Sequence, residues 1–222
     1  MRDGLQIAKL KSIYGHIAER YDIQHTLITA LSDQRGRVMV VENTVSEGDA
    51  VLDCGSGTGS TALLAARKVG AKGAVTLFDL SEDMLAVARK KLEKVRLNRN
   101  TKFLTGDMLQ LPFASDTFDV VLSTYSLCPL YDPAKGAVEL FRVTKPGGKI
   151  GAAHSAVPTN PLTRLVGGWI EDVAWRIPSL TMGCRAVEVL PALEKAGAKV
   201  LMSKTIGVPF WPFEVFVVQK PA

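Results

Sequence analysis

Three aspartates and a glycine-rich turn occur where a nucleoside could be bound. The segment Asp53-Cys54-Gly55-Ser56-Gly57-Thr58-Gly59 lies between a short apolar run and a helical pattern. Glycines allow the backbone to turn sharply and to lie close to a ligand, and the start of the following helix presents free N–H groups. Asp79 ends the next apolar run, where a carboxylate can accept hydrogen bonds from a ribose diol.

Two further acids extend this pattern. Asp107 follows the third apolar run, within Gly106-Asp107-Met108, where its carboxylate could accept from an adenine amino group. Asp53 could attract the cationic amino group of a methionyl moiety. Taken singly, Asp53 could be a turn residue, Asp79 a helix-capping residue and Asp107 a loop residue. Three acids after three successive strands favour a nucleoside site.

The spacing of the glycines separates two cofactor classes. A nicotinamide-binding turn requires G-x-G-x-x-G, but the position of its last glycine is Ser60 here. The observed spacing is G-x-G-x-G, and an acid in the loop fits a pyrophosphate poorly. A nicotinamide-dependent oxidoreductase is therefore disfavoured.

The elements that would position these residues read as a parallel α/β sheet. Five short apolar runs alternate with helical patterns and predict strands at 50–54, 74–79, 102–105, 118–124 and 149–154, and two closing strands follow at 198–206 and 213–219. Helices are expected over 10–21, 27–45 and 185–196, with Pro191 limiting or kinking the last. Ser81 and Asp132-Pro133 are helix-start signals, and Pro146-Gly147-Gly148 is a turn.

We expect one domain over 1–222. Its expected parts are N-terminal cap helices at 1–46, a cofactor-binding core at 47–154, an acceptor-side insertion at 155–183, and a closing helix and strands at 184–222.

Charge and composition limit the partners. The formal charge is +5, and segment 89–102 holds seven basic residues against one acid. Without interleaved aromatic residues this segment favours a solvated helix face over a nucleic-acid site, while contact with an anionic membrane surface stays open. No apolar stretch is long enough for a membrane span, and a signal-peptide core is missing, so we expect a cytoplasmic protein. The three scattered cysteines, Cys54, Cys128 and Cys184, suggest buried thiols rather than a disulfide framework, a metal site or arsenic chemistry.

The order of the motifs resembles class I S-adenosylmethionine methyltransferases, and in particular the ubiquinone/menaquinone-biosynthesis C-methyltransferases. The resemblance covers roughly residues 12–154. It is carried by 18–22, 51–59, 79–85, 106–108, 111–113, 118–121 and 142–148. It implies a Rossmann-like, mostly parallel sheet of seven strands with one antiparallel strand, and N-terminal helices that help to close the site. The cofactor-binding residues expected from the motifs and the resemblance are Asp53, Gly55, Ser56, Gly57, Gly59, Asp79, Leu80, Met84 (packing on the adenine), Gly106, Asp107, Met108 and Ser123. The tryptophan–arginine pair common in the family is missing near 34–38, and the chain after His154 departs from the family pattern.

The residues after the fourth and fifth strands favour a small apolar methyl acceptor, such as a quinol or phenol, and a metal-independent reaction. Ser123-Thr124-Tyr125-Ser126 follows the fourth strand in place of an Asn/Asp-Pro-Pro-aromatic motif, and the acid pairs of a magnesium-dependent catechol site are missing. Aromatic residues after His154, Trp169 and Trp175 among them, could cover the pocket. Candidate catalytic residues are His154, expected beside the transferred methyl, then Tyr125, Tyr21 and His25.

Two alternatives stay open. One is a methyltransferase for phospholipids or other amines at a membrane surface. The other is a non-catalytic module that binds the cofactor and acts through a partner. The oligomeric state also stays open.

Overall fold

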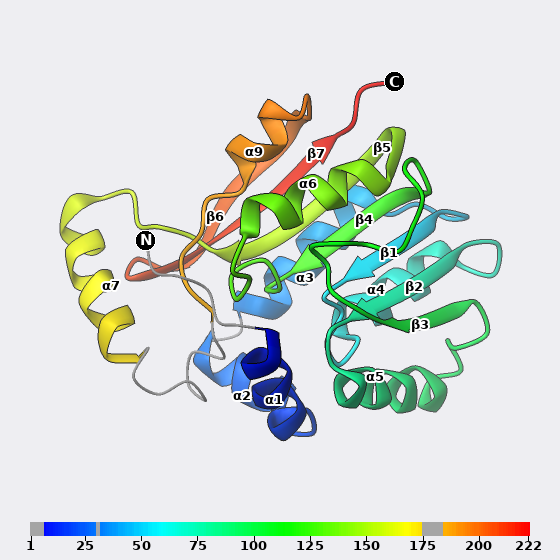
Figure 1. Cartoon of the computed structure of the whole chain (residues 1–222), viewed down its shortest axis with the longest axis horizontal. Coiled ribbons are helices and arrows are strands. Elements are labelled where there is room, and N and C mark those ends of the chain that lie inside the picture. Colours follow the sequence, from blue (N-terminus) through cyan, green and yellow to red (C-terminus); the bar gives the residue numbers. More distant parts are fainter. Residues whose placement is uncertain (1–6, 30–31, 175–183) are drawn as a thin grey trace.

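A seven-stranded sheet forms the centre of the molecule (Figure 1). The computed structural model describes residues 7–29, 32–174 and 184–222. The strands lie in the order β3-β2-β1-β4-β5-β7-β6, and β7 runs antiparallel to both of its neighbours. Their bounds are β1 (Ala50–Cys54), β2 (Ala74–Asp79), β3 (Thr101–Thr105), β4 (Phe118–Thr124), β5 (Thr144–Ser155), β6 (Lys199–Val208) and β7 (Trp211–Gln219). The mostly parallel sheet with one reversed strand is confirmed.

Helices cover both faces of this sheet. Their bounds are α1 (Ile7–Ile17), α2 (Tyr21–Ile28), α3 (Ser32–Thr44), α4 (Ser60–Val69), α5 (Glu82–Lys94), α6 (Pro133–Val143), α7 (Pro161–Ala174) and α9 (Leu190–Lys195). Apolar residues of α3, α4 and α5 pack in one cluster, and those of α6 and α9 pack in another. Because both faces are covered at the centre of the sheet, β1, β2 and β4 are nearly continuous buried runs, whereas the edge strand β3 is largely exposed.

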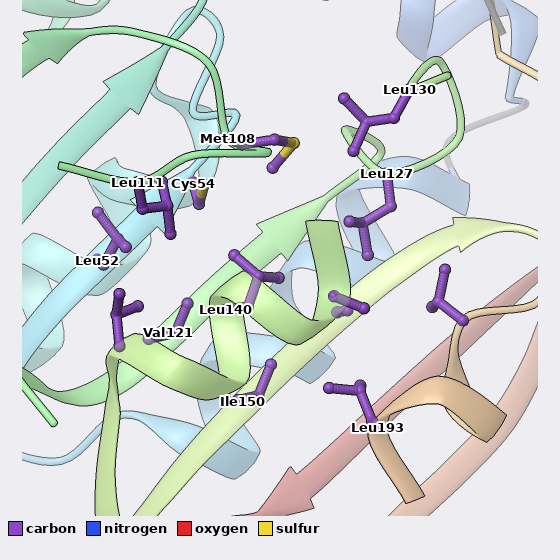
Figure 2. Packing of buried hydrophobic residues seen from close by; sticks show 14 of the residues in the cluster. Leu52, Cys54, Met108, Leu111, Val121, Leu127, Leu130, Leu140, Ile150 and Leu193 are labelled. Carbon is purple, nitrogen blue, oxygen red and sulfur yellow. The ribbon is translucent and has the colours of Figure 1, made fainter. Parts of the chain in front are cut away.

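The core between the sheet and α6 shows how the sequence pattern produces this layer (Figure 2). Leu140 of α6 and Leu193 of α9 lie against Val121 and Ile150 of neighbouring strands, and all four side chains are fully buried. Asp132 accepts a hydrogen bond from the Lys135 N–H at 2.9 Å and begins α6 before Pro133, as predicted. Ser81 likewise caps α5 by accepting from the Met84 N–H.

The N-terminal region differs from the prediction because it is divided into three helices. The expected helix over 10–21 ends at Ile17, where the Arg20 N–H donates to the Ile17 carbonyl and α2 then begins at Tyr21. The expected helix over 27–45 is interrupted after Thr29, whose hydroxyl donates to Asp33. Side-chain bonds of Thr and Asp compete with helical backbone bonds, and the apolar periodicity does not report them.

The region after β5 also differs from the prediction. Residues 184–189 are not helical, and the Val187 N–H donates to the Ser155 carbonyl at 3.0 Å. Pro191 lies in the first turn of α9, where its missing N–H is tolerated, so the helix begins there. Helix α7 stands at the edge of the molecule, and Gly167 approaches the Phe210 backbone between β6 and β7. Trp175 lies outside the described residues.

Within the described part of the chain, no helix is long and apolar enough to cross a membrane.

Candidate active site

A cavity lies at the carboxyl ends of the parallel strands. The sheet order reverses between β1 and β4, and this reversal opens a crevice where ligands of α/β sheets bind. Its walls come from α1–α3, the glycine turn, the ends of β2 to β4 and the loop after β4. They are Ile7, Leu10, Tyr14, Tyr21, Arg37, Gly55, Ser56, Gly57, Thr58, Phe78, Asp79, Leu80, Met84, Gly106, Asp107, Met108, Thr124, Tyr125, Ser126, Pro129, Leu130 and Tyr131.

The three glycines of the turn have different roles. All have positive φ, 71° at Gly55, 52° at Gly57 and 78° at Gly59. A Cβ at Gly59 would meet Ala88 of α5 at 2.9 Å, and one at Gly55 would clash with Ser126. A Cβ at Gly57 would meet only Met84 Cε, at 3.9 Å. Gly59 therefore serves helix packing and is not part of the cavity wall, whereas Gly57 leaves the cavity open.

Asp79 is fixed by the turn that it faces. One carboxylate oxygen accepts from the Gly57 N–H at 2.8 Å and the other from the Ser81 N–H at 2.9 Å. Burial raises the pKa of Asp79, and these backbone N–H groups oppose the shift. The carboxylate lines the cavity with acceptor capacity remaining, which suits a diol.

Around Met84 and Met108, the cavity wall is mostly apolar and carries one acid, Asp107. Met84 is 2% exposed and packs with Ala18 and Tyr21 beneath the N-terminal helices. Asp107 accepts from the Leu109 N–H at 2.9 Å, which orients its carboxyl group beside Met108. With Leu80 and Gly106, these predicted residues all line the cavity.

Two buried polar groups of the turn lack partners. Neither carboxylate oxygen of Asp53 nor the Ser56 hydroxyl has a well-aligned hydrogen-bond partner among the described residues. Burial raises the pKa of Asp53 to about 7, although Arg37 and the Ala62 N–H lower it. Asp53 is fully buried and is not part of the cavity wall. Its acceptor capacity beyond the Ala62 N–H would suit a cationic amino group. The glycine turn and the Asp79 carboxylate thus fit an adenosyl cofactor with an amino-acid tail.

Arg37 is a cavity residue that the sequence prediction missed. It is 5% exposed, and its guanidinium donates to the hydroxyls of Thr61 and Thr124 at 2.9 and 2.8 Å. It also lies over the Tyr125 ring, 5.1 Å from the centroid. Arg37 Nε lacks a hydrogen-bond partner within the described structure and is 3.9 Å from Asp33 Oδ2. A buried cation therefore lines the cavity close to the end of β4.

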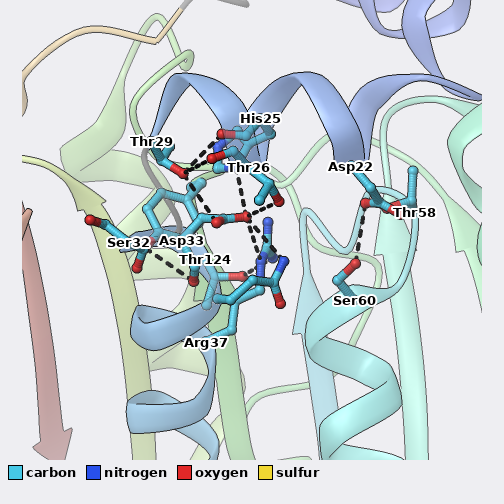
Figure 3. A network of polar contacts seen from close by, with 12 residues as sticks. Asp22, His25, Thr26, Thr29, Ser32, Asp33, Arg37, Thr58, Ser60 and Thr124 are labelled. Carbon is cyan, nitrogen blue, oxygen red and sulfur yellow. Dashed lines mark hydrogen bonds and ion pairs between the residues drawn. The ribbon is translucent and has the colours of Figure 1, made fainter.

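A polar cluster fastens α2 to the glycine turn (Figure 3). Asp22 accepts from the hydroxyls of Thr58 at 2.5 Å and Ser60 at 3.2 Å, and Lys91 of α5 donates to Asp22 at 2.6 Å. These bonds outweigh burial and lower the pKa of Asp22. Lys91 belongs to the basic segment 89–102, so one residue of that segment has a structural role.

A second cluster in Figure 3 joins α2 to α3. His25 Nδ1 lies 3.1 Å from Asp33 Oδ2, and the Thr29 hydroxyl donates to Asp33 at 3.1 Å. Burial lowers the pKa of His25, with Asp33 opposing, and the ring stacks on Tyr21. His25 supports the cavity wall rather than lining it.

The two predicted catalytic tyrosines line the cavity but are poor bases. Burial raises the pKa of Tyr21 and of Tyr125, with Arg37 opposing in both cases. The Tyr125 hydroxyl points to the Ser32 and Asp33 carbonyls at 3.3 and 3.4 Å. At neutral pH both hydroxyls stay protonated, so they can form hydrogen bonds and pack but cannot act as general bases.

The structure does not bring His154 to the cavity. Its ring is fully buried against Phe216, with Nδ1 3.1 Å from the Ser155 carbonyl and Nε2 3.7 Å from Glu214. Alternation along β5 turns it toward the α6 and α9 face. The expected position beside a transferred methyl is therefore corrected.

Two other predicted residues are also displaced from the cavity. Ser123 is fully buried behind the cavity wall. Its hydroxyl lies 2.7 Å from the hydroxyl of Ser126, which is a wall residue. Trp169 is 68% exposed on α7 and covers no part of it.

The fold and the cavity define the class of protein. A solved SAM-dependent methyltransferase from Aquifex aeolicus has a TM-score of 0.64 with 22% identity, covering 92% of this chain and 97% of that one. The geranyl diphosphate C-methyltransferase of Streptomyces coelicolor has a TM-score of 0.70 with 15% identity, covering 86% and 80%. The [4+2]-cyclase SpnF has a TM-score of 0.69 with 20% identity, covering 87% and 82%. This is the Rossmann-like methyltransferase fold, and the fold alone does not fix the reaction.

The chain belongs to the ubiE/COQ5 methyltransferase family, whose model matches residues 3–173. S-adenosylmethionine is the cofactor of this family. A demethylmenaquinone methyltransferase of Lactobacillus johnsonii is 33% identical over 159 residues, covering 71% of this chain and 64% of that protein. The ubiquinone/menaquinone biosynthesis C-methyltransferase UbiE of a Marinomonas species is 30% identical over 158 residues, covering 71% and 63%. The match thus spans less than two thirds of these relatives.

Proposed function

We propose that this protein is a metal-independent methyltransferase that transfers a methyl group from S-adenosylmethionine to a small, largely apolar acceptor of the quinol or phenol class. The observation that carries the proposal is one cavity whose wall combines two kinds of residue. The glycine turn and Asp79 offer polar groups, and Leu10, Tyr14 and Leu130 offer apolar and aromatic surface. The names of the relatives above favour a quinol among such acceptors.

At the cofactor end, the chain binds and orients. Asp79 would accept from the ribose hydroxyls, and Met84 and Met108 would pack on the adenine. Arg37 of α3, which lines the cavity near the end of β4, would pair with the carboxylate of an amino-acid tail. The ammonium of the tail would favour the ionised form of Asp53 at the end of β1. When bound, the cofactor supplies an electrophilic methyl group on a sulfonium.

At the acceptor end, the chain contributes alignment and exclusion of water. Among the described wall residues no histidine is present, and the pKa values of Tyr21 and Tyr125 are raised. A base with a pKa near neutrality is therefore missing from this wall, apart from carboxylates assigned to the cofactor. An acceptor that ionises readily by itself, such as a phenol or quinol, suits this site better than a neutral amide.

The test is formation of S-adenosylhomocysteine by the purified full-length protein. Reduced short-chain quinols, simple phenols, phosphatidylethanolamine vesicles and small amines would be compared, with an Asp79→Asn variant and an exposed Asp116→Asn control. Turnover with quinols or phenols that is lost only in Asp79→Asn supports the proposal. Turnover restricted to amines contradicts it. Cofactor binding without turnover of any acceptor would instead favour a non-catalytic module.

A further inference from the structure

Two of the three cysteines, far apart in sequence, meet beside the cavity. The Cys128 thiol donates to Cys184 Sγ at 2.8 Å across a sequence separation of 56. Both thiols also point at the Tyr125 carbonyl, at 3.5 Å from Cys128 and 3.9 Å from Cys184. Cys128 is fully buried and Cys184 only partly so. All three cysteines are free, as expected, with Cys54 and Cys128 buried and Cys184 partly buried, and the fold brings Cys128 and Cys184 into contact.

The pair joins two segments that build one wall. Cys128 directly precedes Pro129 and Leu130, which line the cavity. Cys184 precedes Arg185, whose guanidinium donates to the Leu130 carbonyl at 2.9 Å. Tyr125, which holds both thiols through its carbonyl, has φ of 59°, a strained conformation for a residue with a side chain. The thiols thus lie at a strained turn of the wall.

We propose that Cys128 and Cys184 form an oxidisable dithiol, which a diffusible oxidant of the peroxide class converts into an intramolecular disulfide. Sulfur atoms in hydrogen-bond contact need only a small displacement to reach the bond length of a disulfide. The more exposed Cys184 would react first. Cys54, buried in β1, has no thiol partner within the described structure and stays reduced.

The chemistry balances with one peroxide. The Cys184 thiolate attacks one oxygen of hydrogen peroxide, the O–O bond breaks, and a sulfenic acid and water form. The Cys128 sulfur then attacks the Cys184 sulfur, the S–O bond breaks, and the second water leaves. The two thiols lose two electrons and two protons, and the peroxide is reduced to two waters. The contact with the Cys128 thiol and burial raise the pKa of Cys184, so the first step requires excess oxidant.

The bond would fasten segment 184–189 to the loop between β4 and α6. Closing a loop of this length restricts the unfolded chain, and we expect the oxidised protein to melt roughly 5 to 15 °C higher than the reduced one. The cofactor end is built mainly by β1 to β3, so cofactor affinity should change less than about twofold.

The experiment uses the folded full-length protein and mass spectrometry. After timed exposure to excess hydrogen peroxide, the protein is denatured and alkylated with N-ethylmaleimide. We expect one alkylated thiol in place of three and a mass lower by two hydrogens before alkylation. Digestion should give a cross-linked peptide pair containing Cys128 and Cys184, and dithiothreitol should restore both thiols and the lower melting temperature.

Single-cysteine variants serve as matched controls. Cys54→Ser should form the cross-link like the wild type, whereas Cys128→Ser and Cys184→Ser should form no intramolecular bond. Three alkylatable thiols after peroxide treatment, a bond that includes Cys54, or sulfinic acid at Cys184 without a cross-link would each overturn the proposal. The wild-type measurement decides even if a variant fails to fold. None of these readouts depends on the proposed methyl transfer. Failure of the disulfide proposal therefore leaves the methyltransferase proposal unaffected, and the reverse also holds.

Discussion

At the scale of single residues, the glycine turn shows that similar residues can be required for different reasons. Gly59 has no room for a Cβ because Ala88 of α5 lies against it, so its requirement is one of folding. At Gly57 protein atoms are distant, and the open side faces the cavity. The Gly57 N–H also donates to Asp79, which couples the turn to the carboxylate. Packing therefore does not require glycine at position 57, and we propose that ligand binding does.

Substitution of Gly57 should reveal this difference. Gly57→Ala introduces strain at φ of 52°, which costs about 1 to 2 kcal/mol of stability, and places a methyl group toward the ligand. We expect affinity for S-adenosylhomocysteine to fall at least about tenfold by calorimetry. Gly147→Ala is the matched control, because Gly147 has φ of 76° and open space around it but lies away from the cavity. Equal affinity in both variants would show that Gly57 is needed only for folding.

Asp53 gives a prediction about pH. Its pKa is raised to about 7 in the folded protein, against about 3.9 when unfolded. A buried acid with a raised pKa binds its proton more tightly in the folded state, so stability falls as pH rises from about 4 to 7 and then levels off. Asp53→Asn removes this loss, which amounts to at most about 4 kcal/mol at pH 8 and roughly 1.5 kcal/mol at pH 5.

Melting of the cofactor-free protein measures this effect. The variant should melt at a higher temperature than the wild type at pH 8. This difference in melting temperature should be smaller at pH 5. Asp116→Asn, an exposed aspartate, should show no such change. A gap that is the same at both pH values would mean that the Asp53 carboxyl does not titrate in this range.

At the scale of elements, the N-terminal helices form the roof of the cavity and are held by few side chains. Leu10, Tyr14 and Tyr21 contribute apolar contacts. The Asp22 cluster ties α2 directly to the residues that follow Gly57, so closure of the roof and the shape of the turn are linked. The ion pair is only partly exposed, with 25% for Lys91 and 38% for Asp22.

Breaking this contact should loosen the roof without unfolding the sheet. Lys91→Met removes the ion pair, which is worth up to about 1 kcal/mol for a partly exposed pair. We therefore expect affinity for S-adenosylhomocysteine to fall roughly two- to fivefold, because a smaller fraction of the protein holds the N-terminal helices closed over the cavity. Lys94→Met, on an exposed position of the same helix, is the control. A melting temperature that drops sharply while affinity per folded molecule is unchanged would assign Lys91 to folding alone.

The elements also show what could be predicted from sequence. The strands β2 and β4 and the cap at Ser81 follow from apolar runs and local hydrogen bonding, and their ends match the prediction. The cofactor residues at strand ends follow because parallel strands share one carboxyl edge. Arg37 was missed because its role depends on Thr61 and Thr124, distant hydroxyls that meet it only in the fold. Its only signal was a basic residue on the buried side of α3.

His154 was misplaced for a related reason. Its position at the end of β5 was right, but the face on which a strand residue lies depends on register, and one residue changes the face. The contact of Cys128 with Cys184 likewise depends on the path of 184–189, and the apolar pattern predicts a helix from 185 that the structure does not have. Such long-range placements are not encoded in local periodicity.

At the scale of the whole molecule, the cavity lies between two parts of the fold, a body with large buried clusters and a roof with few buried apolar contacts. The body is the sheet with its two buried clusters. The roof, α1 and α2, joins the body through the small cluster of Ala18, Tyr21 and Met84 and through the polar contacts of Figure 3. Segments with few buried apolar contacts open more readily than a core. A ligand that contacts both parts should therefore reduce local opening more in α1 and α2 than in the sheet.

Hydrogen exchange of the intact protein can test this division. Saturating S-adenosylhomocysteine at about 100 times its dissociation constant stabilises the folded state by about 2.7 kcal/mol. We expect amides of α1, α2 and the glycine turn to gain the largest protection, because a ligand that fills the cavity would contact Tyr14 and Tyr21 on one side and Gly57 on the other. Amides of α9, β6 and β7, which lie beyond the reversal of the sheet, should change little. In Lys91→Met the gain over α2 should shrink while that at β1 and β2 persists. Uniform protection across all elements would show instead that the molecule opens only as a whole, and that the roof does not move independently.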